Sequence, residues 1–81
     1  MTATADRILA ALAEELRVAP GALSRDARFV EDFGVDSLDF VRVVMAAEEA
    51  GGVRLDDKAA ALVRTVGELL DLAAISPPPE D

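Results

Sequence analysis

The chain has 81 residues, of which 52% are hydrophobic and 30% are charged, a balance typical of one small globular domain rather than a disordered segment. It contains no cysteine and no histidine, which excludes disulfides, thiolate chemistry, histidine-based catalysis and the commonest metal ligands. Its apolar runs are far too short to span a membrane, and no secretory signal is visible. We therefore expect a cytoplasmic protein without a membrane partner.

The net charge of −8 is unevenly distributed along the sequence. Residues 1–28 carry four acidic and four basic residues, so residues 29–81 carry the whole excess of negative charge. Such a surface repels nucleic acid and attracts basic proteins. By composition alone, the simpler interpretation is an acidic surface that keeps the protein in solution.

The first predicted element is an amphipathic helix over residues 3–17. Its apolar residues recur at spacings of three and four and therefore share one face, formed by Ile8, Leu9, Leu12 and Leu16. Pro20 and Gly21 end this pattern and predict a turn. Residues 18–35 then form a long connection, which we expect three apolar anchors to pin to the core: Leu23, Phe29 and Val30.

The second predicted helix runs from about Ser37 to about Ala50. Asp36 is its expected N-cap, and Asp39 adds negative charge where the helix dipole favours it. Gly51 and the glycine after it predict the end of the helix. The spacing predicts a buried face formed by Leu38, Val41, Val44 and Met45, and an opposite stripe formed by Asp39, Arg42, Ala46 and Glu49.

A short helical turn is expected near residues 57–62, before a capping box in which Thr65 caps a last helix and Glu68 follows three residues later. That helix covers about residues 66–75, with an inward face formed by Val66, Leu69, Leu70 and Ala73. The last six residues, SPPPED, cannot continue a helix and predict a flexible tail over residues 76–81. The predicted fold is therefore all-α: a small bundle of three main helices plus one short helix, with a long first loop, in a domain of residues 1–75.

Ser37 stands between two aspartates at the start of the second predicted helix. Serine is a poor nucleophile without an adjacent base, and the chain has no histidine, so we expect no catalytic residue. A calcium loop counted from Asp32 places Gly34 where an oxygen ligand is needed, so we expect no metal site. Two interpretations remain open from the residues: a helix-start serine of no further function, which local physics favours, and a hydroxyl displayed for chemistry.

Residues 29–49, FVEDFGVDSLDFVRVVMAAEE, strongly resemble the acyl carrier protein family, and most closely its carriers of the bacterial fatty-acid type. Those carriers share the pattern F-x-E-D-[LF]-G-x-D-S-L-D, and the resemblance continues without gaps to Val66. It implies that Ser37 receives 4′-phosphopantetheine from coenzyme A through a separate phosphopantetheinyl transferase. It also implies that the thiol of this arm carries acyl groups as thioesters, so the chain would be a non-catalytic carrier.

The same resemblance implies roles for the neighbours of Ser37. Its partners would be the transferase and the acyl-loading and acyl-processing enzymes, which would bind through basic docking patches to a monomeric carrier. Leu38 resembles an exposed leucine that touches partners, and Met45 lies where the family uses an apolar partner contact, although core packing is an alternative for both. The acidic positions implied in partner recognition are Asp36, which also fits the cap, Asp39, Glu48 and Glu49.

The chain departs from the fatty-acid carriers at Arg42, where they usually have a glutamate, and at Ala47 and Gly51, where they usually have larger apolar residues. We expect the small side chains to leave space near the end of the second helix and to reshape the acyl pocket. These departures favour a specialised pathway, such as polyketide assembly, at least as much as fatty-acid synthesis. Two alternative functions are an aminoacyl or peptidyl carrier, although those more often read G-G-[HD]-S-L, and an unmodified helical interaction domain.

Overall fold

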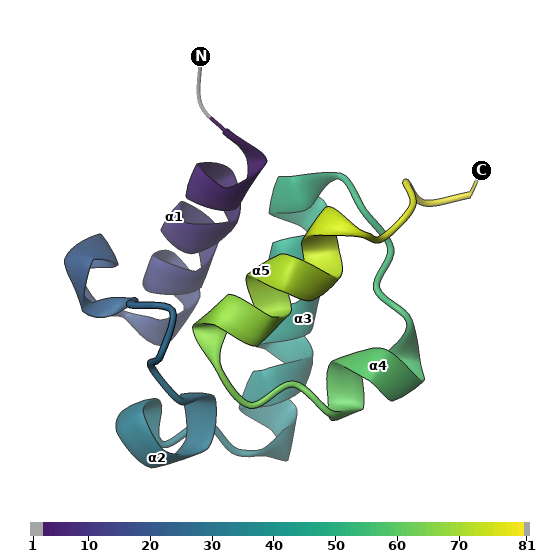
Figure 1. Cartoon of the computed structure of the whole chain (residues 1–81). Helices are drawn as coiled ribbons and strands as arrows, with labels where there is room; N and C mark the ends of the chain where they lie inside the picture. The colour runs from purple at the N-terminus through teal and green to yellow at the C-terminus, as the bar shows by residue number, and fades with distance from the viewer. Residues whose placement is uncertain (1–2, 81) are drawn as a thin grey trace.

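Five α-helices and a short 3₁₀ turn make up the structure, a computed structural model that describes residues 3–80 (Figure 1). The three longest helices confirm the predicted bundle of three main helices, and α4 is the predicted short helix. The connection over residues 18–35 differs from the expected loop because it contains the 3₁₀ turn and α2. In chain order the elements are α1 (Thr4–Leu16), η1 (Pro20–Ala22), α2 (Phe29–Phe33), α3 (Ser37–Gly51), α4 (Asp57–Ala61) and α5 (Val66–Ala74).

The core lies where α1 packs along α3, with α5 against both (Figure 1). Ile8 and Leu12 are buried as the spacing of the first helix predicts, and Leu9 and Leu16 are partly buried. A Cβ atom placed on Gly51 would lie 3.0 Å from Ile8 Cδ1, and Ala47 is fully buried. The predicted empty space at Gly51 is therefore wrong, because the side chain of Ile8 occupies it.

The predicted buried face of α3 is also wrong for three of its four residues. Leu38, Val41 and Met45 are 74%, 55% and 60% exposed, and only Val44 is partly buried. Apolar residues occur on both sides of this helix, so the three-and-four spacing fits two faces, and only packing against α1 distinguishes them. The face that packs inward is formed by Phe40, Val43, Val44, Ala47 and Ala50.

The connection between α1 and α3 is fastened to the start of α5 by backbone hydrogen bonds. The N–H groups of Val66 and Gly67 each donate over 2.9 Å, to the carbonyls of Ala27 and Arg25 respectively. Two predicted anchors, Leu23 and Phe29, are buried as expected. The third, Val30, is 59% exposed, so that prediction is wrong, because α2 turns this residue away from the core.

The last helix confirms its predicted inward face, since Val66, Leu69 and Ala73 are buried and Leu70 is partly buried. Beyond α5, Ser76 Oγ donates to the carbonyl of Leu72 over 2.6 Å, and the Arg54 N–H donates to the carbonyl of Pro77 over 2.8 Å. Among the helices of residues 3–80, none is long and apolar enough to cross a membrane.

Candidate functional site at the start of α3

The start of α3 is closed by two aspartates that cap each other. The Asp39 N–H donates to Asp36 Oδ1 over 2.8 Å, and the Asp36 N–H donates to Asp39 Oδ2 over 3.3 Å. This capping box confirms Asp36 as the N-cap and gives Asp39 a role that the sequence analysis did not assign. Ser37 is exposed, and its hydroxyl has no hydrogen-bond partner within residues 3–80. The serine is thus not needed for capping.

The first turn of α3 also leaves two backbone donors open. Among the described residues, the N–H groups of Ser37 and Leu38 have no acceptor, while the N–H groups of Asp39 and Phe40 are used by Asp36. Free N–H groups at the start of a 15-residue helix carry partial positive charge. A phosphate group bonded to Ser37 would therefore find donors and a favourable dipole beside it, which fits the prosthetic group that the resemblance implies.

A hollow of about 430 Å³ opens beside Ser37, between α2, the start of α3 and the segment from α4 to α5. Most of its wall is apolar, and the rings of Phe29 and Phe40 meet edge to face there with their centroids 5.8 Å apart. The hollow is lined by Phe29, Val30, Glu31, Val35, Asp36, Ser37, Phe40, Ala61, Val63 and Arg64. An apolar chain attached at Ser37 could leave water by entering this space.

The far wall of this hollow, formed by Ala61, Val63 and Arg64, was not predicted from the sequence. The two walls are held together by the Phe29 N–H, which donates to the carbonyl of Arg64 over 3.1 Å, next to an isolated bridge between Arg28 and Thr65. These contacts join residues far apart in sequence. The only local signal was Val63, an apolar residue just before the predicted cap of the last helix.

The outer face of α3 presents a row of exposed apolar side chains, Leu38, Val41 and Met45, which begins one residue after Ser37. The structure therefore places Leu38 and Met45 outside the core. Glu49 is exposed on the same helix. Glu48 differs, because its Oε2 accepts the Leu55 N–H over 2.9 Å and so ties down the loop after α3.

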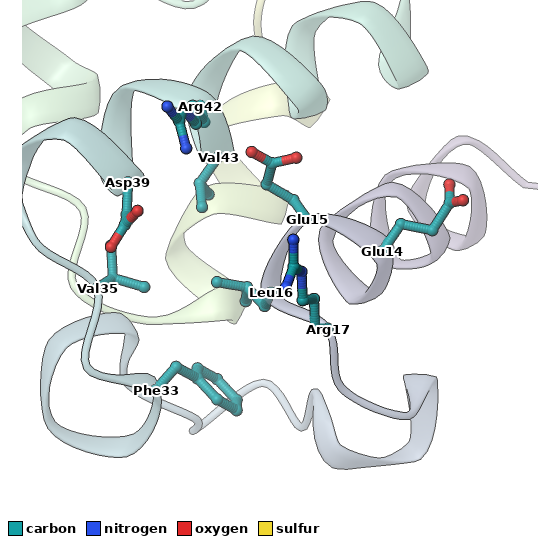
Figure 2. A pocket seen from close by; sticks show the side chains of 9 residues that line it. All are labelled: Glu14, Glu15, Leu16, Arg17, Phe33, Val35, Asp39, Arg42 and Val43. Atoms are coloured by element: carbon teal, nitrogen blue, oxygen red, sulfur yellow. The ribbon is translucent and has the colours of Figure 1, made fainter.

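A second hollow, of about 550 Å³, lies on another side of α3, toward the end of α1 (Figure 2). Ser37 is not among its lining residues, and charged side chains from both helices point into it. The residues that line it are Glu14, Glu15, Leu16, Arg17, Phe33, Val35, Asp39, Arg42 and Val43. Its polar character makes it a poor place for an acyl chain.

Comparison with known proteins agrees with this geometry. Residues 6–73 match the family described as phosphopantetheine attachment site. An acyl carrier protein of Sulfurovum sp. (strain NBC37-1) is 40% identical over 65 residues, which cover 80% of this chain and 87% of that protein. The chain belongs to the acyl carrier protein family. This confirms the predicted family, the carrier role and the prosthetic group, which is a covalently bound phosphopantetheine. As a member of this family, the carrier interacts with modifying and acyl-processing enzymes.

Proposed function

We propose that Ser37 is the residue that carries the 4′-phosphopantetheine arm. The observation that supports this most strongly is the exposed Ser37 hydroxyl, which takes no part in the cap formed by Asp36 and Asp39. When bound, the arm supplies a thiol that holds acyl groups as thioesters. Ser37 is the point from which such an arm can reach both solvent and the apolar hollow.

Attachment needs a partner enzyme, because the chain has no histidine to activate Ser37. The Ser37 oxygen would form a bond to the pantetheine-side phosphorus of coenzyme A. The diphosphate linkage would break, and adenosine 3′,5′-bisphosphate would leave. The hydroxyl proton would pass to a base of a separate phosphopantetheinyl transferase. The chain itself contributes the open N–H groups of Ser37 and Leu38, which can donate to the new phosphodiester.

We further propose that the carried acyl chain enters the hollow beside Ser37, between the rings of Phe29 and Phe40 and the side chain of Val63. Each methylene removed from water contributes about 0.8 kcal/mol. A carrier loaded with a medium-length acyl group should therefore melt at a higher temperature than the carrier with the bare arm. Equal Tm values for the two forms would place the acyl chain in solvent.

Partner enzymes, in this proposal, dock on the outer face of α3. An enzyme that reaches Ser37 must cover the neighbouring surface, which carries Leu38, Val41 and Met45 in a row. Among the acidic residues predicted to contact partners, Asp36 and Asp39 lie beside Ser37. Asp36, Asp39 and Glu48 each accept a backbone hydrogen bond, whereas the Glu49 side chain accepts none among the described residues. The excess of negative charge should steer basic partners, so association should slow as salt is added.

The proposal also covers where the carrier is modified, its oligomeric state and where its domain ends. Coenzyme A is a cytoplasmic metabolite, so we place the modification in the cytoplasm. The carrier acts as a monomer, and its domain covers residues 1–75. The tail predicted over residues 76–81 is fastened at its start by the hydrogen bonds of Ser76 and Pro77, and residues 1, 2 and 81 lie outside the described residues. Fatty-acid and polyketide assembly are both compatible with the apolar hollow.

Intact-mass measurement after incubation with coenzyme A and a broad-specificity phosphopantetheinyl transferase tests the central claim. We expect a gain of about 340 Da on the native chain and none on Ser37→Ala. Ser24→Ala and Ser76→Ala are matched controls that should gain the same mass as the native chain. A native chain that stays unmodified would favour an interaction domain instead, and modification of Ser37→Ala would move the site elsewhere.

Nuclear magnetic resonance provides a second measurement, which detects the modification of Ser37 directly. In a ¹H–¹⁵N spectrum, the amide signals of Ser37 and Leu38 should shift downfield on modification, because their N–H groups gain a phosphate acceptor. The amides of Val66 and Gly67, which already have acceptors, should barely move.

A further inference from the structure

Arg42 is the one basic residue of α3, and it is exposed near the middle of the helix. It follows the exposed Leu38 by one turn and lies beside Met45, at the margin of the apolar row. Arg25 and Arg28 form ion pairs with nearby carboxylates, whereas Arg42 forms none within residues 3–80. A cation without an ion-pair partner therefore lies between the apolar row and the second hollow, whose lining includes Arg42.

The neighbours of Arg42 explain why it has no ion-pair partner among the described residues. The residues four positions away on either side are Leu38 and Ala46, which carry no charge. Asp39, one turn earlier, is already used by the Asp36 N–H. Figure 2 shows Arg42 above Asp39 and across from Glu15 of α1, but no carboxylate oxygen of either residue is within ion-pairing distance.

We propose that Arg42 determines which enzymes dock on this carrier, by selecting partners that place an acidic side chain against the middle of α3. The inference rests on the proposed function, in which enzymes dock on the outer face of α3. Arg42 is five residues from Ser37, about 7.5 Å along the helix axis, so an enzyme at Ser37 also covers it. An acidic side chain there is attracted by Arg42, and a basic one is repelled.

The charge distribution favours a different protein as the occupant of this face, rather than a second copy of the chain. Two copies that met here would bring together two chains of net charge −8. An enzyme with a mixed docking patch can instead match the acids beside Ser37 with basic residues and match Arg42 with an acid. A purely basic patch would pair with the acids but not with Arg42.

The test uses a phosphopantetheinyl transferase with a basic docking patch as the probe, at low salt. We expect Arg42→Glu to raise kcat/KM for modification about 3- to 10-fold, because it removes a repulsive contact and adds an attractive one. Lys58→Glu is the matched control: it makes the same change in net charge at an exposed residue of α4, which lines a hollow that includes no residue of α3. We expect it to change kcat/KM less than about 2-fold, since it acts only through the long-range field.

Single Lys→Glu or Arg→Glu changes in the transferase patch supply the reciprocal measurement. At least one of them should reverse the preference, so that the native carrier is modified faster than Arg42→Glu. If both carriers are modified at equal rates by every transferase variant, Arg42 has no part in partner choice and the inference is overturned. If intact mass shows that no transferase modifies Ser37 in either carrier, the proposed function itself has failed.

Stability measurements separate this role from a structural one. Arg42→Glu should leave the Tm within about 2 °C of the native value, since Arg42 is exposed and unpaired. Equal, larger losses of Tm for Arg42→Gln and Glu15→Gln, with no further loss in the double variant, would assign Arg42 to a contact between α1 and α3. That result would overturn the proposal.

Discussion

The starts of α3 and α5 are built alike but lie in different surroundings. Each has a capping box, with Asp36 and Asp39 in α3 and with Thr65 and Glu68 in α5. In α5 the residue after the cap, Val66, is fully buried, whereas the corresponding Ser37 of α3 is exposed.

The backbone donors show the same contrast. The first two N–H groups of α5 donate to carbonyls of Ala27 and Arg25, while those of Ser37 and Leu38 have no acceptor among the described residues. A capping box is thus compatible with two different roles of a helix start. The α5 start fastens the connection between α1 and α3 to the core. The α3 start keeps a hydroxyl and two donors available.

Exchanging the first residues of α3 and α5 should give the largest difference in unfolding free energy between the two helix starts. Val66→Ser removes a fully buried apolar side chain and buries a hydroxyl, which should cost about 2 to 4 kcal/mol of unfolding free energy. Ser37→Val changes an exposed position and should stay within about 0.5 kcal/mol of the native value, while abolishing modification. Urea denaturation measures both. A similar loss from the two variants would mean that the two helix starts are equally buried in solution.

Sequence reasoning predicted both caps because capping depends on side chains only three residues apart. It also placed the end of α3 correctly to within one residue, since Gly52 adopts the left-handed conformation that ends the helix. It placed the buried face of α3 wrongly except at Val44, because the spacing of Leu38, Val41 and Met45 suits a buried face as well as the spacing of Phe40, Val43 and Ala47 does. Only contact with α1 decides between them.

The functional site likewise contains some residues that only contacts between distant segments bring together. Ser37 and its aspartates lie in one short run of sequence, so the resemblance could identify them. The wall formed by Ala61, Val63 and Arg64 comes from the segment between α4 and α5 and depends on the hydrogen bond between Phe29 and Arg64. Long-range backbone contacts of this kind leave no periodic signal in the sequence.

Substitutions at the second residue of α5 and of α3 should give the next largest difference in unfolding free energy. A Cβ atom on Gly67 would lie 2.9 Å from the carbonyl oxygen of Arg25, and a backbone atom cannot move away cheaply. Gly67→Ala should therefore destabilise the fold by about 1 to 3 kcal/mol, despite the better helix propensity of alanine. Leu38→Ala, at an exposed position, should cost less than about 0.5 kcal/mol. If Gly67→Ala proved as stable as the native chain, the close approach of the two segments would be relaxed in solution.

Removing the caps should show where the two starts behave alike. The Asp39 N–H donates to Asp36 Oδ1 over 2.8 Å, and the Glu68 N–H donates to Thr65 Oγ1 over 3.1 Å. Asp36→Ala and Thr65→Ala should each cost about 1 kcal/mol, as loss of an N-cap usually does. Chemical denaturation of the two variants is the measurement. A cost for Thr65→Ala alone would show that α3 does not need its cap, which would weaken the argument that Ser37 is spared from capping.

The smallest expected effect is a pH dependence at the α5 box. The backbone N–H of Arg64 and, next in importance, that of Thr65 donate to Glu68 Oε1 over 2.8 and 3.0 Å, and these bonds hold the pKa of Glu68 below its usual value. A carboxylate with a lowered pKa in the folded state contributes stability that is fully present above the unfolded pKa of about 4.3. That stability is lost as the pH falls through the lower folded pKa. Glu68→Gln keeps a residue suited to the box but does not titrate.

The difference in Tm between the native chain and Glu68→Gln should therefore be constant near neutral pH and should shrink as the pH falls below about 4. Circular dichroism melts over this range measure it. The difference should persist in added salt, because its cause is direct hydrogen bonding from backbone groups rather than attraction between distant charges. A difference that widens on acidification would have the wrong sign for a carboxylate held by these two N–H groups, and the α5 box would then be open in solution.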